Sequence, residues 1–333
     1  MGERIAVVGA TGYTGSLVVA ELRRRDVEVV PVGRLAPAVM VDALDGCRAV
    51  ISCVGSFVDS GEAVVTAAIA AGLPYVDTSA EFPFLQRIFD RHDGPARQAG
   101  VAVVPGMAFY SAPADLASAL AARALGRPPD TVEIAYHLSG ARPSRGTLRT
   151  NLRRIGEPCF VRESGQLVAR RIGDDARAGR FQNGTVARWP GGEVLTVPRH
   201  TGAGSVGVFL AMPNVVAAAF RCPGVTAFLQ RVGRVVVGQA RGGPTPAVRQ
   251  RARFTIVAEA RAGGAAARCV VEGHDLYGLT AAACVEAAQG LGVVLDGPSG
   301  ALAPAEAFDP AAFLDALSAY LTWHVQLIGK DQT

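Results

Sequence analysis

The sequence predicts an α/β protein, in which a doubly wound parallel sheet precedes a second, α+β domain. Over the first hundred residues, short β-rich runs alternate with helical stretches, as they do in βαβ units. From Thr131 onward, period-2 strands mix with Gly- and Arg-rich loops, and after His274 the pattern is helical again. The 333 residues suit two domains at about 150 residues each. We expect the parallel-sheet domain at residues 1–128, an inserted α+β domain at 129–275 and C-terminal helices at 276–333.

The first part of the chain supplies five predicted strands and three predicted helices. The strands are Arg4–Val8, Val27–Val32, Ala49–Cys53, Pro74–Asp77 and Val101–Val104, and the helices are Thr14–Arg25, Gly61–Ala71 and Phe84–Ala99. The stretch from Gly33 to Gly46 is too short for a helix and another strand. We therefore expect one edge strand of the usual six-stranded order to be missing, which leaves the crevice at the switch point of the sheet intact.

The later part of the chain has fewer clear elements. Two strands are predicted at Thr131–Leu138 and Phe254–Ala260, and helices at Leu276–Leu291 and Pro310–Leu327. Asp309 is placed to cap the last helix, with Pro310 at its first position.

Composition excludes several classes of protein. The net charge is only +4 with acids and bases interspersed, which argues against nucleic acid as a partner. Lys330 is the only lysine, so Schiff-base, P-loop and Tyr-x-x-x-Lys chemistry are not expected. The six cysteines are scattered singly without a C-x-x-C pair, so we expect small buried thiols and no metal site.

Membrane and secretory segments are not expected either. Glycines and Pro213-Asn214 interrupt the uncharged run from Thr201 to Phe220, which indicates a strand, a turn and a helix instead of a membrane span. The N-terminus leads directly into a strand and does not resemble a secretory signal, so a cytoplasmic location is expected.

A glycine-rich turn follows the first predicted strand and opens the first predicted helix. It reads GATGYTG over residues 9–15. In this context Gly9 permits a tight turn, Gly12 lets the backbone approach a pyrophosphate, and Gly15 lets helix and strand pack closely, as in a Rossmann domain. We expect the loop to bind a dinucleotide through Gly9, Thr11, Gly12, Tyr13, Thr14 and Gly15. The alternative is a glycine turn without a ligand.

The end of the second strand distinguishes the two nicotinamide cofactors. A carboxylate there hydrogen-bonds the ribose 2′-hydroxyl of NADH, whereas this chain has Val32-Gly33-Arg34 and no acid before Asp42. The guanidinium of Arg34 suits the 2′-phosphate, so NADPH is the expected cofactor. A solvated surface arginine is the alternative interpretation.

Several segments together resemble the saccharopine dehydrogenase-like oxidoreductases, which include trans-acting enoyl reductases. The matching segments are residues 9–15, 33–34, 52–57, 75–81, 99–105, 109–115, 144–147, 198–202 and 277–280. The resemblance implies a Rossmann domain, an α+β domain that covers the nicotinamide and mediates homodimer contacts, and terminal helices that return to the first domain. The chain departs from the family at Ser56, where proline is usual, at Ala80, where glycine is usual, and at residues 108–110, where Gly-Phe-Asp is usual.

The segment after the third predicted strand is expected to border the nicotinamide ribose. It supplies Cys53, Val54, Gly55 and Phe57 as cofactor-binding candidates and Ser56 as a substrate-binding candidate. An ordinary strand-to-helix turn is the alternative.

Hydride transfer needs a proton source for the atom that becomes negative. Tyr110 is the first candidate, and Asp77 and Glu81 follow because both come after a strand that ends at the same edge of the sheet. His200 is a substrate-binding candidate. A turn-capping role for Asp77 and a structural role for His200 are the alternatives.

Arg145 opens a predicted helix and could bind a substrate carboxylate or phosphate. Arg149, Arg153 and Arg154 lie at helical spacing and indicate a basic face for an acidic partner such as an acyl carrier protein.

The resemblance and these residues lead us to expect an NADPH-dependent reductase of a C=C or C=N bond in a small or carrier-bound metabolite. A catalytically silent NADPH-binding regulator and a carbonyl reductase are the alternatives.

Overall fold

The computed structural model describes residues 3–33, 35–155, 157–178, 181, 184–239, 242–293 and 297–329. Two compact units share the chain. The first consists of residues 1–112 and 276–319, and the second of residues 113–275 and 320–333. The predicted domain boundaries follow residues 128 and 275, and the chain passes between the units after Ala112 and Asp275. It passes between them once more, after Ala319.

In the first unit, six strands of the described chain form a parallel sheet in the order β14-β5-β4-β3-β1-β2. The order reverses between β1 and β3, which is the switch point of a doubly wound sheet. The strands are β1 (Arg4–Val8), β2 (Glu28–Val32), β3 (Ala49–Ser52), β4 (Tyr75–Asp77), β5 (Ala102–Val104) and β14 (Gly300–Ala301).

The predicted loss of an edge strand is confirmed. Between β2 and β3 the described chain forms only one helix, α2 (Pro37–Ala43). β14 comes from much later in the sequence and pairs with β5 at the opposite edge, so the sheet still has six strands. The two residues of β14 are too few to show a strand pattern in the sequence.

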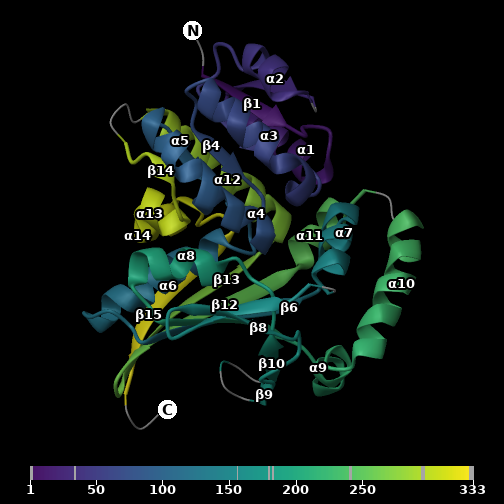
Figure 1. Ribbon diagram of the computed structural model, residues 1–333, viewed down its shortest axis with the longest axis vertical. Helices are drawn as coiled ribbons and strands as arrows, with labels where there is room; N and C mark the ends of the chain where they lie inside the picture. The colour runs from purple at the N-terminus through teal and green to yellow at the C-terminus, as the bar shows by residue number, and fades with distance from the viewer. Residues whose placement is uncertain are drawn as a thin grey trace. The chain divides into compact units, whose positions relative to one another are not determined.

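Helices cover both faces of this sheet (Figure 1). α1 (Tyr13–Arg24) packs against α12 (Leu276–Val293), and α12 also contacts β3 and β4. On the other face α3 (Phe57–Ala70) contacts β3, β4, α2 and α4 (Phe82–Arg87). The apolar side chains of β1 and β3 are fully buried between these layers. The single helix predicted over 84–99 is instead α4, a π-helical segment (Ile88–His92) and α5 (Asp93–Gln98).

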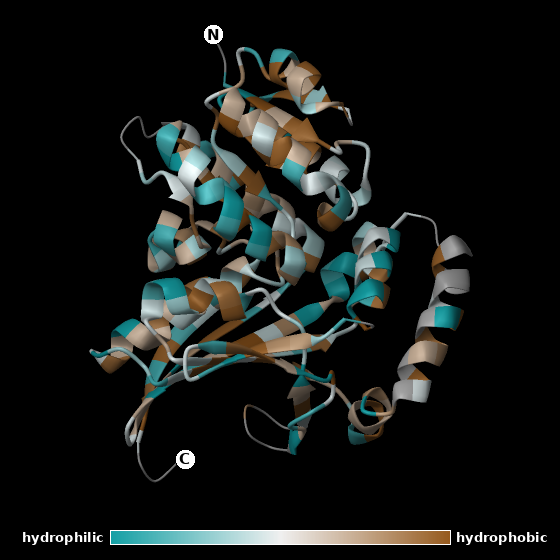
Figure 2. Cartoon of the chain, viewed as in Figure 1, coloured by the Kyte–Doolittle hydropathy of each residue, from teal (hydrophilic) through white to brown (hydrophobic). Residues whose placement is uncertain are grey.

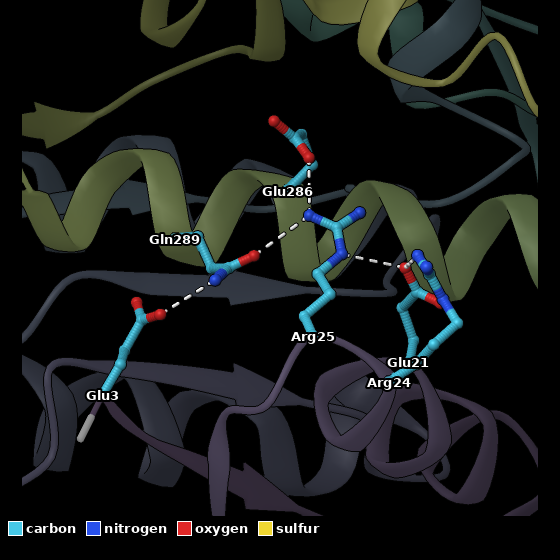
Figure 3. A network of polar contacts seen from close by, with 6 residues as sticks. All are labelled: Glu3, Glu21, Arg24, Arg25, Glu286 and Gln289. Atoms are coloured by element: carbon cyan, nitrogen blue, oxygen red, sulfur yellow. Dashed lines mark hydrogen bonds and ion pairs between the residues drawn. The ribbon is translucent and has the colours of Figure 1, made fainter.

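A network of charged side chains attaches α12 to the first βα unit (Figure 3). The Arg25 guanidinium lies between helices, 2.9 Å from a carboxylate oxygen of Glu21 and 2.7 Å from one of Glu286. Gln289 accepts a hydrogen bond from Arg25 at 3.0 Å and donates one to Glu3 at 2.8 Å. Segments more than 260 residues apart in the sequence are thereby held together.

The second unit contains a nine-stranded mixed sheet of described residues, with main order β15-β13-β12-β6-β11-β10-β9. β6 and β11 are parallel, and the other pairs are antiparallel. Its strands are β6 (Thr131–Ser139), β7 (Cys159–Glu163), β8 (Gln166–Arg170), β9 (Arg177–Ala178), β10 (Thr185–Arg188), β11 (Ser205–Ala211), β12 (Arg253–Ala262), β13 (Ala265–His274) and β15 (Leu321–Ile328). Its helices are α6 (Ala112–Leu125), α7 (Arg145–Arg154), α8 (Glu193–Thr201), α9 (Asn214–Phe220), α10 (Pro223–Gln239) and α11 (Pro246–Arg251).

The helix predicted over Pro310–Leu327 is wrong in its second half. The Asp309 cap is confirmed, since its carboxylate accepts hydrogen bonds from Ala311 N and Ala312 N, but α14 ends at Ala316. α13 (Pro304–Ala307) precedes it, and the chain after it forms β15. The cause is the alternation from Leu321 to Leu327, which suits the edge of a sheet and lets β15 pair with β13 along its whole length.

The interrupted run from Thr201 to Phe220 forms the end of α8, then β11 and α9, as its breaks predict. In the described part of the chain no helix has the length and apolar character needed to cross a bilayer (Figure 2).

Candidate functional site

The glycine loop lies at the carboxyl end of β1, beside the carboxyl end of β3. Gly9 has a φ of +83°, and a Cβ on it would stand 2.7 Å from the carbonyl oxygen of Cys53. A Cβ on Gly15 would stand 2.1 Å from the carbonyl oxygen of Gly9. Both positions therefore require glycine, one for backbone conformation and close approach and the other for helix–strand packing.

The start of α1 is open to solvent. Thr11 and Gly12 are exposed, and Gly12, as the N-cap residue, contributes no side-chain cap. The first turn of α1 carries no acidic residue. Backbone N–H groups at such a helix end carry partial positive charge and attract an anion, so the geometry suits the pyrophosphate of a dinucleotide.

The second predicted segment lies directly against this loop. Cys53 N donates to the carbonyl oxygen of Val8 at 2.8 Å, and Gly55 is exposed beyond it. The structure thus brings residues 9–15 and 53–56 together, as expected from the switch-point rule. Phe57 differs from the other cofactor-binding candidates of this segment. Its ring is buried and packs against the ring of Phe84, with 5.3 Å between centroids.

Ser56 adopts an unusual backbone conformation just before α3. Its φ is +63°, which is rare for residues other than glycine and is closed to proline. Its hydroxyl donates to Asp59 at 2.5 Å. A proline at position 56, which is usual in the resembling proteins, could not adopt this φ.

Asp77, a candidate acid, is fully enclosed at the end of β4. One carboxylate oxygen accepts from Ser79 N and Gly106 N, both at 2.8 Å, and the other accepts from the Tyr75 hydroxyl at 2.9 Å. Burial raises the pKa of Asp77, while the hydrogen bonds from Gly106 and Ser79 oppose the rise. With none of its surface exposed, this carboxylate connects the loops after β4 and β5.

Glu81 is likewise used within the fold. It is buried, and one of its oxygens accepts from Phe57 N at 2.8 Å, so it supplies a carboxylate to the first turn of α3. This contact favours a positioning role, because it joins the loop after β4 to the loop after β3.

Tyr110 lies in the turn between β5 and α6 and is half-buried. Its ring meets that of Phe109 edge to face, with 4.9 Å between centroids. Unlike Asp77 and Glu81, it retains partial exposure, and a proton donor must come within hydrogen-bond reach of the atom that it protonates.

α12 connects the Tyr110 loop to the glycine loop. The ring of Tyr277 packs edge-on against Tyr13 at 5.0 Å, and one turn later the Thr280 hydroxyl accepts from Phe109 N at 3.1 Å. Neither residue was singled out from the sequence as part of the site. The sequence pointed to them only through residues 277–280 (YGLT), one of the segments that carry the family resemblance. That resemblance did not indicate that these residues lie beside the glycine loop.

Arg145, His200 and Arg34 are the remaining candidates. Arg145 and His200 belong to the second unit, and Arg34 falls outside the described residues. Arg145 is exposed at the start of α7, as predicted. His200 Nε2 lies 3.0 Å from a carboxylate oxygen of Asp115, and both side chains are buried, so this histidine connects α8 to α6.

The basic face predicted from Arg149, Arg153 and Arg154 is wrong in one member. Arg149 and Arg153 are exposed on α7, whereas Arg154 is 6% exposed and lies inside the unit. Arg145, four residues before Arg149, takes its place on that face.

A second buried carboxylate, Glu193, lies in the second unit. The Tyr136 hydroxyl donates to one of its oxygens, and the other has no hydrogen-bond partner in the described chain. Burial raises the pKa of Glu193 to about 7, with a contribution from Asp115, while Tyr136 and Arg154 oppose the rise. Sequence reasoning missed this residue because nothing local marks a glutamate as buried.

The described cysteines form no disulfide, and the described residues that could ligate a metal form no cluster. All six thiols are free, and Cys222 is exposed, contrary to the expectation that all six are buried. Burial raises the pKa of the Cys53 thiol to about 12, so it is neutral beside the glycine loop. Among the described residues, His, Cys, Asp and Glu side chains form no group able to hold a metal ion.

Comparison with solved structures identifies the fold. DAP dehydrogenase from C. glutamicum, solved in complex with DAP, matches over 96% of this chain and 98% of its own, with 16% identity and a TM-score of 0.53. Amine dehydrogenase from Mycobacterium smegmatis matches over 92% and 96%, with 11% identity and a TM-score of 0.46. Dihydrodipicolinate reductase from Paenisporosarcina sp. TG-14 matches over 91% and 98%, with 12% identity and a TM-score of 0.42.

No family model matches the sequence, and no curated protein matches it. The likeness to DAP dehydrogenase confirms the predicted class of fold, a Rossmann-type parallel-sheet domain with a second domain built on a mixed sheet.

Proposed function

We propose that this chain is an NADPH-dependent oxidoreductase that reduces a C=N or C=C bond. The observation that carries the proposal is the glycine loop at the switch point. Gly9 and Gly15 are sterically required there, and the exposed, acid-free start of α1 faces the crevice. The fold shared with a dehydrogenase agrees with this proposal.

The residues present fit a dinucleotide. Gly9, Gly12 and Gly15 shape the turn, and the first-turn N–H groups of Tyr13 and Thr14 would hold the pyrophosphate. Backbone of residues 53–55 would border the nicotinamide ribose. When bound, the reduced nicotinamide supplies a hydride. The protein's tasks are to orient it, to exclude water and to protonate the product.

We assign the proton transfer to Tyr110. Asp77 and Glu81 are buried and hydrogen-bonded within the fold, whereas Tyr110 retains exposure and its loop is connected by Thr280 to the helix that contacts Tyr13. Tyr110→Phe should lower kcat by roughly 100-fold with little change in NADPH affinity. Unchanged turnover would eliminate the phenol as the donor.

Titration calorimetry tests the cofactor directly. Wild-type protein should bind NADPH in a one-to-one ratio, and Gly12→Asp should abolish binding by placing a carboxylate at the helix start. Arg34→Ala should weaken NADPH far more than NADH, because the 2′-phosphate is the only difference between them. Binding of neither cofactor at millimolar concentration would overturn the proposal.

The substrate class extends the proposal further. We infer a small or carrier-bound metabolite and a homodimeric enzyme of the saccharopine dehydrogenase-like type, supported by the segments quoted above. Turnover assays with imine, enone and carbonyl panels distinguish C=N, C=C and C=O reduction.

A catalytically silent NADPH-binding regulator is the second candidate. It is favoured by the structural use of both Asp77 and Glu81, which leaves one candidate acid. NADPH binding without oxidation by any compound of the panel would support it.

A further inference from the structure

We propose that α12 makes the placement of the Tyr110 loop (residues 105–111) depend on the cofactor, with Tyr277 and Thr280 as positioning residues. Thr280 holds the Tyr110 loop, and Tyr277 contacts the glycine loop. The identity of the cofactor rests on the proposed function. The attachment of the Tyr110 loop to α12 does not depend on it.

One face of α12 contacts both loops. Tyr277, Thr280 and Cys284 share this face, because intervals of three and four residues bring side chains to the same side of a helix. A helix rises about 1.5 Å per residue, so the face is about 10 Å long. At its start the Tyr277 ring meets the ring of Tyr13 at 89°, with 5.0 Å between centroids. Further along, the other two side chains bind the Tyr110 loop.

The Thr280 hydroxyl is oriented as an acceptor for the Tyr110 loop. It donates its proton to the carbonyl oxygen of Leu276 at 2.8 Å, and its oxygen accepts from Phe109 N at 3.1 Å. Phe109 and Thr280 are only 3% and 7% exposed, so water is a poor substitute for this contact. A buried N–H group is costly without an acceptor. Thr280 therefore fixes the backbone directly before Tyr110.

Other anchors hold the base of this loop. Gly106 N donates to the Asp77 carboxylate at 2.8 Å, and Met107 N donates to the carbonyl oxygen of Asp77 at 2.7 Å. The Cys284 thiol donates to the carbonyl oxygen of Met107 at 3.1 Å. These anchors lie three and four residues before Tyr110, so they fix the base of the loop and not the position of the phenol.

The packing of α12 suits it to carry a displacement from one loop to the other. The helix contacts α1, β3 and β4, and every residue from 278 to 285 is buried. Beyond this stretch, Arg25 lies 2.7 Å from Glu286 and attaches the helix to the first βα unit (Figure 3). A closely packed helix moves as a unit. A shift at Tyr277 is therefore passed to Thr280, one turn later.

Tyr13 lies where a dinucleotide would meet the glycine loop. It is the first residue of α1, directly after the exposed Gly12, and an anion is attracted to such a helix start. An anion bound there would restrict the first turn of α1 and with it the Tyr13 ring. Because Tyr277 packs on this ring, the restriction extends to α12. We expect the protein with NADPH bound to hold the Tyr110 loop more firmly than the free protein.

Hydrogen–deuterium exchange of the full-length protein tests this inference without a substrate. Exchange of the peptide covering residues 105–112 is followed with and without saturating NADPH. In the wild-type protein NADPH should slow this exchange at least roughly threefold.

Variants of Thr280 test the attachment of the loop in the free protein. Thr280→Val keeps the shape of the side chain but lacks the acceptor, so exchange of residues 105–112 should be roughly tenfold faster. Thr280→Ser should restore slow exchange, and Thr280→Ala gives the same comparison as valine with a smaller side chain. Thr66→Val is the matched control, since the Thr66 hydroxyl on α3 donates to the carbonyl oxygen four residues earlier in the same way, at 2.9 Å, and is exposed. It should leave this exchange unchanged.

Variants of Tyr277 test the dependence on the cofactor. Tyr277→Leu should abolish the slowing by NADPH without changing exchange in the free protein, and Tyr277→Phe, which keeps the ring, should preserve it. Coupling between two sites is reciprocal, so Tyr277→Leu should raise the Kd for NADPH by no more than roughly threefold. A general defect of the helix would instead speed exchange in the free protein as well.

Three results would refute the inference: NADPH binds but leaves exchange of residues 105–112 unchanged, Thr280→Val behaves like Thr66→Val, or Tyr277→Leu retains the slowing by NADPH. If calorimetry detects no NADPH binding, the proposed function fails, and the dependence on the cofactor fails with it. Exchange of Thr280→Val in the free protein still decides whether Thr280 holds the loop.

Discussion

The two units of this molecule each bury a carboxylate, but they surround it differently. Asp77 in the first unit accepts three hydrogen bonds, two of them from backbone N–H groups, at the end of a parallel strand. Glu193 in the second unit accepts one from Tyr136, and its other oxygen has no partner in the described chain. Backbone donors compensate a buried charge, whereas a partly satisfied carboxylate tends to become protonated. Burial raises the pKa of both carboxyl groups, and that of Glu193 to about 7. The first arrangement fixes loops, and the second makes stability depend on pH up to neutrality.

The glycine loop offers the most severe way to disturb the first unit. Gly15→Ala should cost about 3 kcal/mol or more and abolish NADPH binding, because its Cβ would stand 2.1 Å from the carbonyl oxygen of Gly9. Gly290→Ala is the matched control, since that position in α12 is exposed and a Cβ there would stand 3.5 Å from the Phe308 ring, an ordinary contact distance, so alanine should stabilise the helix by up to about 1 kcal/mol. Chemical denaturation measures both. Equal effects would show that the contact does not constrain the loop.

Asp77 tests whether its role is structural or catalytic. Asp77→Ala should lower the free energy of unfolding by about 2–4 kcal/mol, because the three donors lose their acceptor. Asp77→Asn can still accept the two backbone N–H bonds and should retain most of the stability and kcat. If Asn abolishes turnover while the protein remains folded, Asp77 takes part in the proton transfer.

Glu193 makes the pH dependence of the second unit measurable. Its folded pKa of about 7 lies above the ordinary value of 4.5, so the folded state binds more protons between these pH values. Stability should therefore decrease as pH rises from 4.5 to about 7, by up to about 3 kcal/mol from this group. Glu193→Gln should remove this decrease and be the more stable form at pH 8. Parallel pH profiles for the two proteins would contradict this account.

Ser56 is the mildest perturbation of the crevice. Ser56→Gly should stabilise the protein by about 1 kcal/mol, because glycine adopts a φ of +63° without steric cost. Ser56→Pro should have the opposite and larger effect, since proline cannot adopt a positive φ. Denaturant midpoints distinguish the two. A stable Ser56→Pro variant would mean that residue 56 can adopt a negative φ in this loop.

Local patterns were sufficient where backbone geometry decides the structure. The βαβ alternation and the spacing of glycines 9, 12 and 15 predicted the parallel sheet, the missing edge strand and the loop at its switch point. They failed at Leu321–Ile328, where a strand pairs with β13, and at β14, which has too few residues to show a period. In both cases a partner distant in the sequence determines the element.

The sequence by itself determined the class of fold and the position of the glycine loop, because glycine placement and hydrophobic period act over a few residues. Only the tertiary structure decided which polar side chains are enclosed and which stay accessible. Asp77, Glu81 and Arg154 are buried, whereas Tyr110 and Arg145 retain exposure. Burial depends on segments brought together by folding, such as α12 against the first βα unit, and no local pattern encodes it.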